Sequence, residues 1–244
     1  MKPSVFVFCA TSLIFLAWAM DNVLSANQQQ GFLSQTTDIR DFVRQTFIHG
    51  VPYEEASKHD SDAVPILLEM LTDTTEQPYW SNIVVTLGIV GNEKAVDPLI
   101  AFINEDYQGT LSHSLYTAKT SAIISLGYLI NKSGNKKALS YLIDCLSPGM
   151  WMERNLKWVS PYHRSIEDRN IELSKMAILG LALSGRPDAG EALRSIKRPA
   201  ETELAKRFQA EAADLIDEAL EEYEIISQKG LFEYQKEVRK RHQH

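Results

Sequence analysis

The sequence contains too few cysteines for a disulfide framework. It has two, and one of them, Cys9, lies in an apolar N-terminal segment that we expect to be removed. The other, Cys145, then has no intramolecular partner, so the fold must depend on a hydrophobic core. We interpret Cys145 as a small buried apolar side chain rather than as a nucleophile, and a disulfide to a partner chain is a third interpretation.

The signatures of several functional classes are also missing. The net charge is −7, whereas a nucleic-acid-binding protein normally carries a basic excess, so no nucleic-acid partner is predicted. The histidines are scattered, with no pair at i, i+4 and no neighbouring cysteines, so no metal site or cofactor is predicted. The hydrolase motifs G-x-S-x-G and H-E-x-x-H do not occur, and no catalytic residue is predicted.

Residues 1–26 have the features of a secretory signal peptide. Lys2 precedes an almost wholly apolar run, residues 5–20, which is shorter than the roughly 18–20 residues that span a bilayer. Cleavage after Ala26 would leave residues 27–36 as a flexible segment and no membrane span in the mature protein. We therefore expect export to a periplasmic or extracellular location; an uncleaved N-terminal membrane anchor is the alternative.

From residue 37 onward, apolar residues recur with the spacing of helix faces. The clearest example is a helix ending near Gly91, followed by a second helix with Val96, Leu99, Ile100 and Ile103 on one face. Similar pairs begin near residues 37, 118 and 173. The spacing therefore predicts four helical hairpins, and self-similarity of this period is typical of a helical solenoid.

A Leu-Gly step occurs inside the first helix of three of these pairs, at Gly88, Gly127 and Gly180. A glycine within a helix destabilises it by roughly 1 kcal/mol relative to alanine, so three equivalent glycines need a packing reason. We expect the missing Cβ to let the second helix of each pair pack tightly against the first.

The C-terminal part predicts helices that close the end of the array. A long helix is expected from Glu201 to about Gln228, with a buried apolar stripe and an acidic outer face. Gly230 ends it, and residues 229–244 form a last short helix and a basic tail. The predicted repeat domain is thus residues 37–228.

Residues 86–99 resemble a HEAT-like repeat of the type found in phycobilisome lyases and many bacterial proteins. Residues 125–127 and 178–180 match the first half of that pattern, and residues 63–65 match the second half. The resemblance implies an all-α fold, a right-handed α-solenoid of about four HEAT-like hairpins with C-terminal capping helices. It also implies protein–protein contact, whereas no residue here supports carrying over the lyase activity.

Residues 147–168 are an insertion in the third hairpin period, and insertions of this kind often form the binding face of a repeat array. The segment is rich in the residue types that dominate interface hot spots. The candidate partner-binding residues are Trp151, Arg154, Trp158, Tyr162, His163 and Arg164. The competing interpretation is that the tryptophans fold back to cover helix surface. A weaker candidate is the loop 104–117, with Tyr107, His113 and Tyr116.

Together these features predict an exported, non-catalytic scaffold or adaptor that binds an unknown protein partner. One alternative is a lyase- or hydrolase-like enzyme with polar groups converging around His163, Arg164 and Glu167. The other is a small-ligand or chromophore pocket lined by residues of the same insertion, Trp151, Trp158 and Tyr162.

Overall fold

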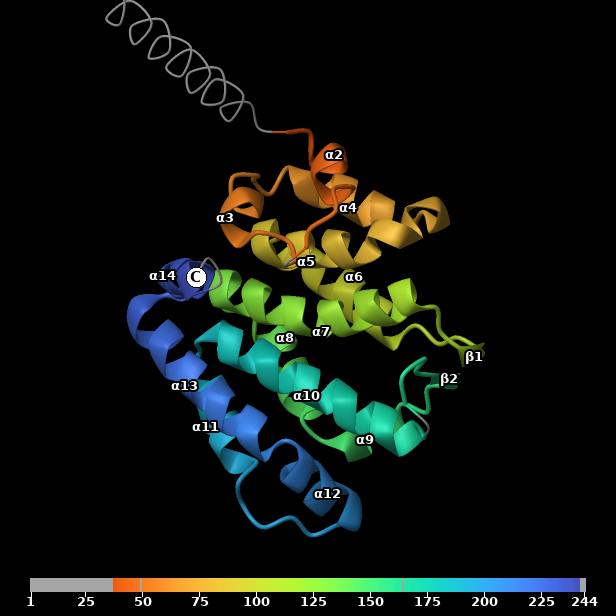
Figure 1. The fold of residues 1–244 in the computed structure, drawn as a ribbon, viewed down its shortest axis with the longest axis vertical. Helices are drawn as coiled ribbons and strands as arrows, with labels where there is room; N and C mark the ends of the chain where they lie inside the picture. The colour runs from red at the N-terminus through yellow and green to blue at the C-terminus, as the bar shows by residue number, and fades with distance from the viewer. Residues whose placement is uncertain (1–36, 49, 164, 242–244) are drawn as a thin grey trace, which may run out of the picture. The chain divides into compact units, whose positions relative to one another are not determined.

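Helices make up almost all of the regular structure in the computed structural model, which describes residues 37–48, 50–163 and 165–241 (Figure 1). The predicted all-α class is therefore confirmed for this part of the chain. The expected signal peptide, residues 27–36, Arg164 and the last three residues lie outside it.

The described part contains long helices joined by short turns, together with a few short elements. The helices are α2 (Ile39–Val43), α3 (Tyr53–Ala56), α4 (Ala63–Thr72), α5 (Trp80–Val90), α6 (Glu93–Asn104), α7 (His113–Ser133), α8 (Lys136–Cys145), α9 (Pro148–Glu153), α10 (Ile166–Ser184), α11 (Pro187–Ser195), α12 (Glu203–Glu211), α13 (Ala213–Lys229) and α14 (Leu231–Arg241). A 3₁₀ helix, η1 (Thr74–Tyr79), precedes α5, and two-residue strands, β1 (Gly109–Thr110) and β2 (Trp158–Val159), pair in parallel.

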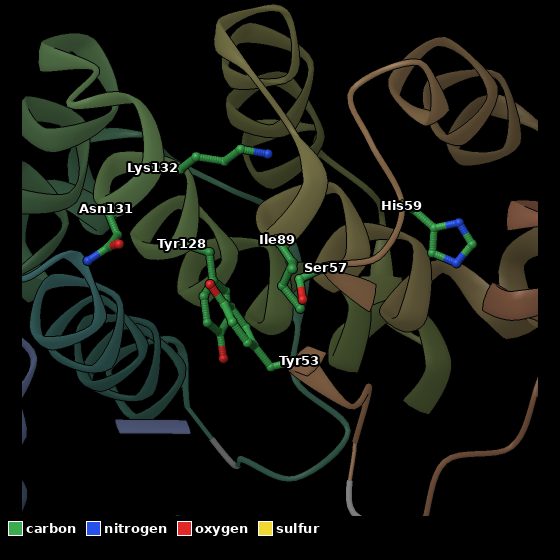
Figure 2. Close-up of a pocket in the computed structure, with 7 residues that line it drawn as sticks. All are labelled: Tyr53, Ser57, His59, Ile89, Tyr128, Asn131 and Lys132. Carbon is green, nitrogen blue, oxygen red and sulfur yellow. The ribbon is translucent and has the colours of Figure 1, made fainter. Parts of the chain in front are cut away.

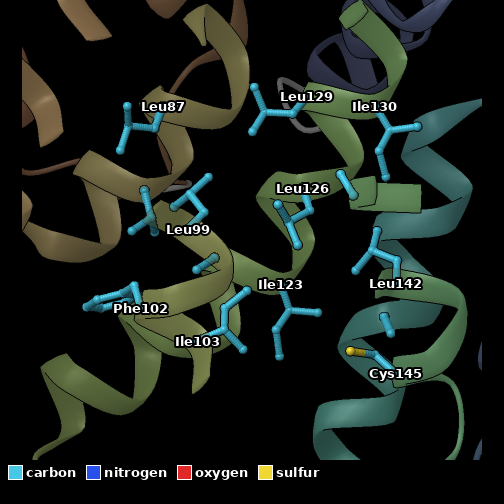
Figure 3. Close-up of a cluster of buried hydrophobic side chains, with 14 of the residues drawn as sticks. Leu87, Leu99, Phe102, Ile103, Ile123, Leu126, Leu129, Ile130, Leu142 and Cys145 are labelled. Atoms are coloured by element: carbon cyan, nitrogen blue, oxygen red, sulfur yellow. The ribbon is translucent and has the colours of Figure 1, made fainter. Parts of the chain in front are cut away.

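Two rows of helices pack in chain order within residues 39–241. Helices α5, α7, α10 and α13 each contact the next member of one row, and α4, α6, α8 and α11 do so in the other. The first row can be followed from yellow to blue in Figure 1. The core lies between the rows, where leucine and isoleucine side chains of α5, α6, α7 and α8 meet (Figure 3).

Local signals in the sequence define many of the helix ends. The side chains of Asn92, Asn135 and Ser165 each accept a hydrogen bond from a backbone N–H in the first turn of the helix that follows. Gly185, with φ 58°, takes the left-handed conformation that ends α10, and Pro187 starts α11. Gly-Arg-Pro at residues 185–187 is a local sequence signal for a helix stop, and the structure ends α10 and begins α11 there.

The Leu-Gly glycines do allow close approach, but the expected partner was wrong. A Cβ on Gly88 would lie 2.7 Å from the carbonyl oxygen of Ser125 in α7. A Cβ on Gly127 would overlap the carbonyl group of Gly180 in α10. The glycines therefore bring first helices of successive pairs together, α5 to α7 and α7 to α10, rather than the two helices of one hairpin. Of the three glycines, Gly180 also approaches the second helix of a hairpin, because a Cβ there would lie 3.0 Å from Leu142 in α8, the second helix of the preceding pair.

Two predicted helices differ from those observed. The helix expected over residues 201–228 is divided at Ala212, where the backbone has φ −104° and ψ 5°. This break has no glycine or proline to signal it; α12 contacts α9 while α13 contacts α10 and α11, so tertiary packing separates them. The hairpin predicted to begin near residue 37 starts with a short helix that ends at Val43, and the additional helix α3 follows before α4.

We predict that Gly127→Ala destabilises the protein by at least about 2 kcal/mol, because the added methyl overlaps backbone atoms that cannot rotate away. Without that overlap, alanine would stabilise the helix by about 1 kcal/mol. Urea unfolding followed by circular dichroism measures the change. The matched control is Gly149→Ala in α9, where the added methyl meets only the rotatable Ser147 hydroxyl. Equal stabilities of the two variants would contradict the packing role.

Candidate functional site

The two loops singled out in the sequence lie against each other. Strands β1 and β2 pair Gly109 with Trp158, and the N–H of Leu111 donates to the carbonyl of Val159 at 3.1 Å. The Asp106 carboxylate also accepts a hydrogen bond from the backbone N–H of Lys157, at 2.6 Å. We call residues 105–112 and 154–163 the loop pair; it lies beyond the N-terminal ends of α7 and α10 (Figure 1).

The two tryptophans of the insertion are buried, Trp151 in α9 and Trp158 within the loop pair itself. Trp151 and Trp158 are 0% and 1% exposed, and the Trp151 indole N–H donates to the carbonyl of Cys145 at 3.1 Å. These rings cover helix surface, as the competing interpretation expected. Exposed tryptophan anchors are therefore not part of the candidate site.

Arg154 joins the insertion to α6 and α8. Its guanidinium lies over the rings of Tyr141 and Trp151, at 4.4 and 4.5 Å from their centroids. It donates to the Tyr141 hydroxyl at 2.6 Å and to the side-chain oxygen of Asn104 at 3.0 Å. These contacts hold the guanidinium against its own chain, so Arg154 stabilises the insertion rather than projecting from it.

A buried arginine that the sequence did not single out supports the loop pair from below. Arg169, in the first turn of α10, is 1% exposed and lies 4.7 Å from the centroid of the Trp158 ring. It donates to the carbonyls of Leu156, at 3.1 Å, and Trp158. Burial lowers the pKa of Arg169. The residue follows two acidic positions at a helix start, and that pattern alone would place it in solvent.

Lys119 of α7 has a similar structural role. Its ammonium is buried and donates to three carbonyls at the C-terminal end of α6, those of Phe102 (2.6 Å), Ile103 (3.3 Å) and Glu105 (2.8 Å). The last carbonyls of a helix lack intrahelical donors, so this lysine satisfies them where water has no access. Burial lowers the pKa of Lys119 to about 8.

Tyr162 is the aromatic side chain that the loop pair presents to solvent. It is 58% exposed, and its hydroxyl lies 2.6 Å from Nδ1 of His113. The Tyr162 ring packs edge-on against His113 and the buried Tyr116, with centroids 4.9 and 5.3 Å apart. The exposed ring is thus held in one position by a histidine and a tyrosine of the other candidate segment.

The side chains of Ser160, His163 and Glu172 form a row in space beside Tyr162. Ser160 Oγ is 2.8 Å from His163 Nδ1, and His163 Nε2 is 4.0 Å from a Glu172 oxygen. Ser160 is buried, and its Oγ also accepts the backbone N–H of Tyr162 at 3.0 Å. The hydroxyl therefore fixes the turn between residues 160 and 163 and is not presented as a nucleophile.

The polar convergence expected for an enzyme involves His163, Arg164 and Glu167, of which the structure describes His163 and Glu167. Glu167, which was expected near His163, is exposed and lies 3.9 Å from Arg207 of α12. Arg164 lies outside the described residues. Cys145 is a buried free thiol, and burial raises its pKa to about 11, which disfavours the reactive thiolate.

Ser133 and Lys136 have the spacing S-x-x-K, which in some hydrolases pairs a nucleophilic serine with a lysine. The structure places Ser133 at the end of α7, where its hydroxyl donates to the carbonyl of Leu129 at 2.6 Å. Gly134 turns the chain between the two residues. The hydroxyl is thus engaged with its own helix, and no nucleophilic pair is seen.

A cavity of about 250 Å³ lies elsewhere, at the C-terminal ends of α5 and α7 (Figure 2). Seven residues from three parts of the chain line it: Tyr53, Ser57, His59, Ile89, Tyr128, Asn131 and Lys132. The Lys132 ammonium donates to the carbonyl of Val90 at 2.8 Å, and burial lowers its pKa. No sequence pattern indicates this cavity, because its walls come from residues 53–59, 89 and 128–132, which are far apart along the chain.

Residues 37–48, 50–163 and 165–241 contain neither a cluster of metal ligands nor a membrane-spanning helix. No group of three or more histidine, cysteine, aspartate or glutamate side chains there could hold a metal ion. No helix in the same ranges is both long and apolar enough to cross a membrane.

Comparison of the chain with protein-family models, with curated proteins and with solved structures finds no match. The function of the protein is therefore inferred from the geometry described above.

We predict that Lys119 makes stability depend on pH. Its pKa is about 8 in the folded protein and 10.5 ordinarily, so the unfolded chain binds more protons between these values and stability rises with pH. The free energy of unfolding of the wild type, minus that of Lys119→Met, should increase by at most about 1.4 kcal/mol per pH unit from pH 8 to pH 10.5.

The subtraction removes the contributions of other groups, among them Cys145 and the buried tyrosines, that titrate in the same range. Urea unfolding at several pH values gives both free energies. A difference that stays constant or falls between pH 8 and pH 10.5 would show that the Lys119 ammonium is not desolvated.

Proposed function

We propose that the protein is an exported, non-catalytic adaptor built as a right-handed α-solenoid of about four HEAT-like hairpins with C-terminal capping helices. The two rows of helices that pack in chain order support this architecture. So does the equivalent position of Gly88, Gly127 and Gly180, which lie at the contacts between successive members of one row. Arrays of this kind present extended surfaces that suit the binding of another protein.

The loop pair is the recognition surface in this proposal, and the observation that carries it is the fixed, exposed Tyr162. A tyrosine held before binding loses little conformational entropy when a partner covers it, and tyrosine is frequent among interface hot spots. His113 and His163 flank it and supply ring nitrogens for hydrogen bonds at the rim. Below them, Trp158 and Arg169 keep the surface rigid.

This division of roles modifies the original set of candidate residues. Tyr162 and His163 remain candidate contact residues, and His113 joins them from the other loop. Trp151, Trp158 and Arg154 instead form the support on which the contact residues depend.

We predict that Tyr162→Ala abolishes capture of the partner while leaving the fold intact, because the ring is largely solvent-exposed. The full chain, immobilised and exposed to proteins of the exported fraction, should retain a partner that the variant does not. The matched control is Phe232→Ala, which removes a 45% exposed aromatic ring from α14. A partner retained equally by all three proteins would place recognition outside the loop pair, and retention of no protein by the wild type would count against the adaptor function.

Trp158→Ala should act differently, since it removes a fully buried ring. We predict a loss of about 3–5 kcal/mol in the free energy of unfolding. Thermal and urea unfolding measure it. A variant with unchanged stability would mean that Trp158 does not support the loop pair.

A further inference from the structure

The cavity at the ends of α5 and α7 contains a positive charge that its own chain compensates only in part. Lys132 has three N–H donors, and one of them is used on the carbonyl of Val90. In the described part of the chain, no carboxylate forms an ion pair with Lys132, and desolvation alone shifts its pKa. Lys132 is an exposed residue, so two donors of its ammonium remain open to acceptors from solvent or from a ligand.

The carbonyl end of α5 offsets part of this charge. A helix C-terminus is equivalent to about half of a negative elementary charge. An ammonium beside it therefore retains a net positive potential of roughly the same size. That net positive potential favours an anion over a cation.

The other walls of the cavity combine two tyrosine rings and one aliphatic side chain with the polar groups of Ser57, His59 and Asn131. The rings of Tyr53 and Tyr128 are 5.8 Å apart, lie together in Figure 2, and come from α3 and α7. Ile89, the penultimate residue of α5, adds an aliphatic surface. The Asn131 amide N–H donates away from the cavity, to the carbonyl of Ser184 at 3.1 Å. A ligand here would contact the Lys132 ammonium at one point and could lay an apolar part against the two tyrosine rings.

The cavity volume limits the size of the ligand. About 250 Å³ corresponds to roughly eight water molecules at the volume that each occupies in the liquid. This is smaller than the pockets that hold drug-sized molecules, which begin at about 300 Å³. A ligand of roughly ten non-hydrogen atoms fits.

From these contacts we propose that the cavity binds a small organic monocarboxylate, with its carboxylate on Lys132 and its apolar body against Tyr53 and Tyr128. This site is separate from the loop pair, which lies at the opposite end of α7, and it does not depend on the adaptor function. The structure thus assigns the chain a small-ligand site as well as a surface for a protein.

Calorimetric titration of the full chain tests the proposal with three probes. Benzoate has a carboxylate on an aromatic ring and is expected to bind. Benzamide has the same shape without the charge and should bind at least about tenfold more weakly, the loss of one charge-assisted hydrogen bond. Inorganic phosphate, which lacks the apolar body, should also bind at least about tenfold more weakly. Failure of benzoate to bind, or equal binding of benzamide, would overturn the proposal, and preferential binding of phosphate would show a general anion site instead.

Variants place the binding in this cavity. Lys132→Met should weaken benzoate binding at least about tenfold, whereas Lys137→Met, which removes an exposed lysine paired with Asp97, should not change it. Ser57→Trp adds a large ring at the exposed rim, away from Lys132, and should also weaken binding by filling the cavity. If Lys132→Met does not fold, Ser57→Trp decides the result. Unchanged affinity in either folded variant would overturn the assignment.

Discussion

The close backbone approach of α7 to its two neighbours is the constraint on which the rest of the structure depends. Gly127 of α7 and Gly180 of α10 let these two helices meet without a Cβ between them, and Gly88 lets α5 approach α7 in the same way. Because α7 is held at this distance on both sides, its two ends are fixed relative to the ends of α6, α5 and α10. The loop pair at one end and the cavity at the other are consequences of that fixed position.

Close packing of helices also creates an electrostatic requirement, because helix ends that are shielded from water leave carbonyl groups without donors. Cationic side chains of neighbouring helices satisfy them. Lys119 donates to the end of α6, Lys132 to the end of α5, and Arg186 to the carbonyls of Ile130 and Asn131 at the end of α7. Arg169 does the same for the loop strand β2. Lys132 is the cation of this group that lines the cavity, and this links the packing of the helices to the proposed ligand site.

Features that depend on near neighbours in the chain could be predicted. The apolar spacing gave the all-α class and most helices between residues 63 and 196, and Gly185 with Pro187 marked a helix stop. Features that depend on distant segments could not. The glycine contacts were assigned to the wrong helix, Ala212 carried no signal of a break, and Lys119 and Arg169 resembled ordinary surface residues because nothing near them in sequence indicates their burial.

The sequence by itself determined that the chain forms short amphipathic helices with defined ends, since helix propensity, capping and apolar periodicity act over a few residues. It also identified the two segments from which the candidate surface is built. Only the tertiary structure decided that these segments pair, that Trp151 and Trp158 turn inward and are buried, and that Tyr162 remains exposed. The physical reason is that the exposure of a side chain is set by whatever segment covers it, and here that segment lies some 50 residues away in the chain.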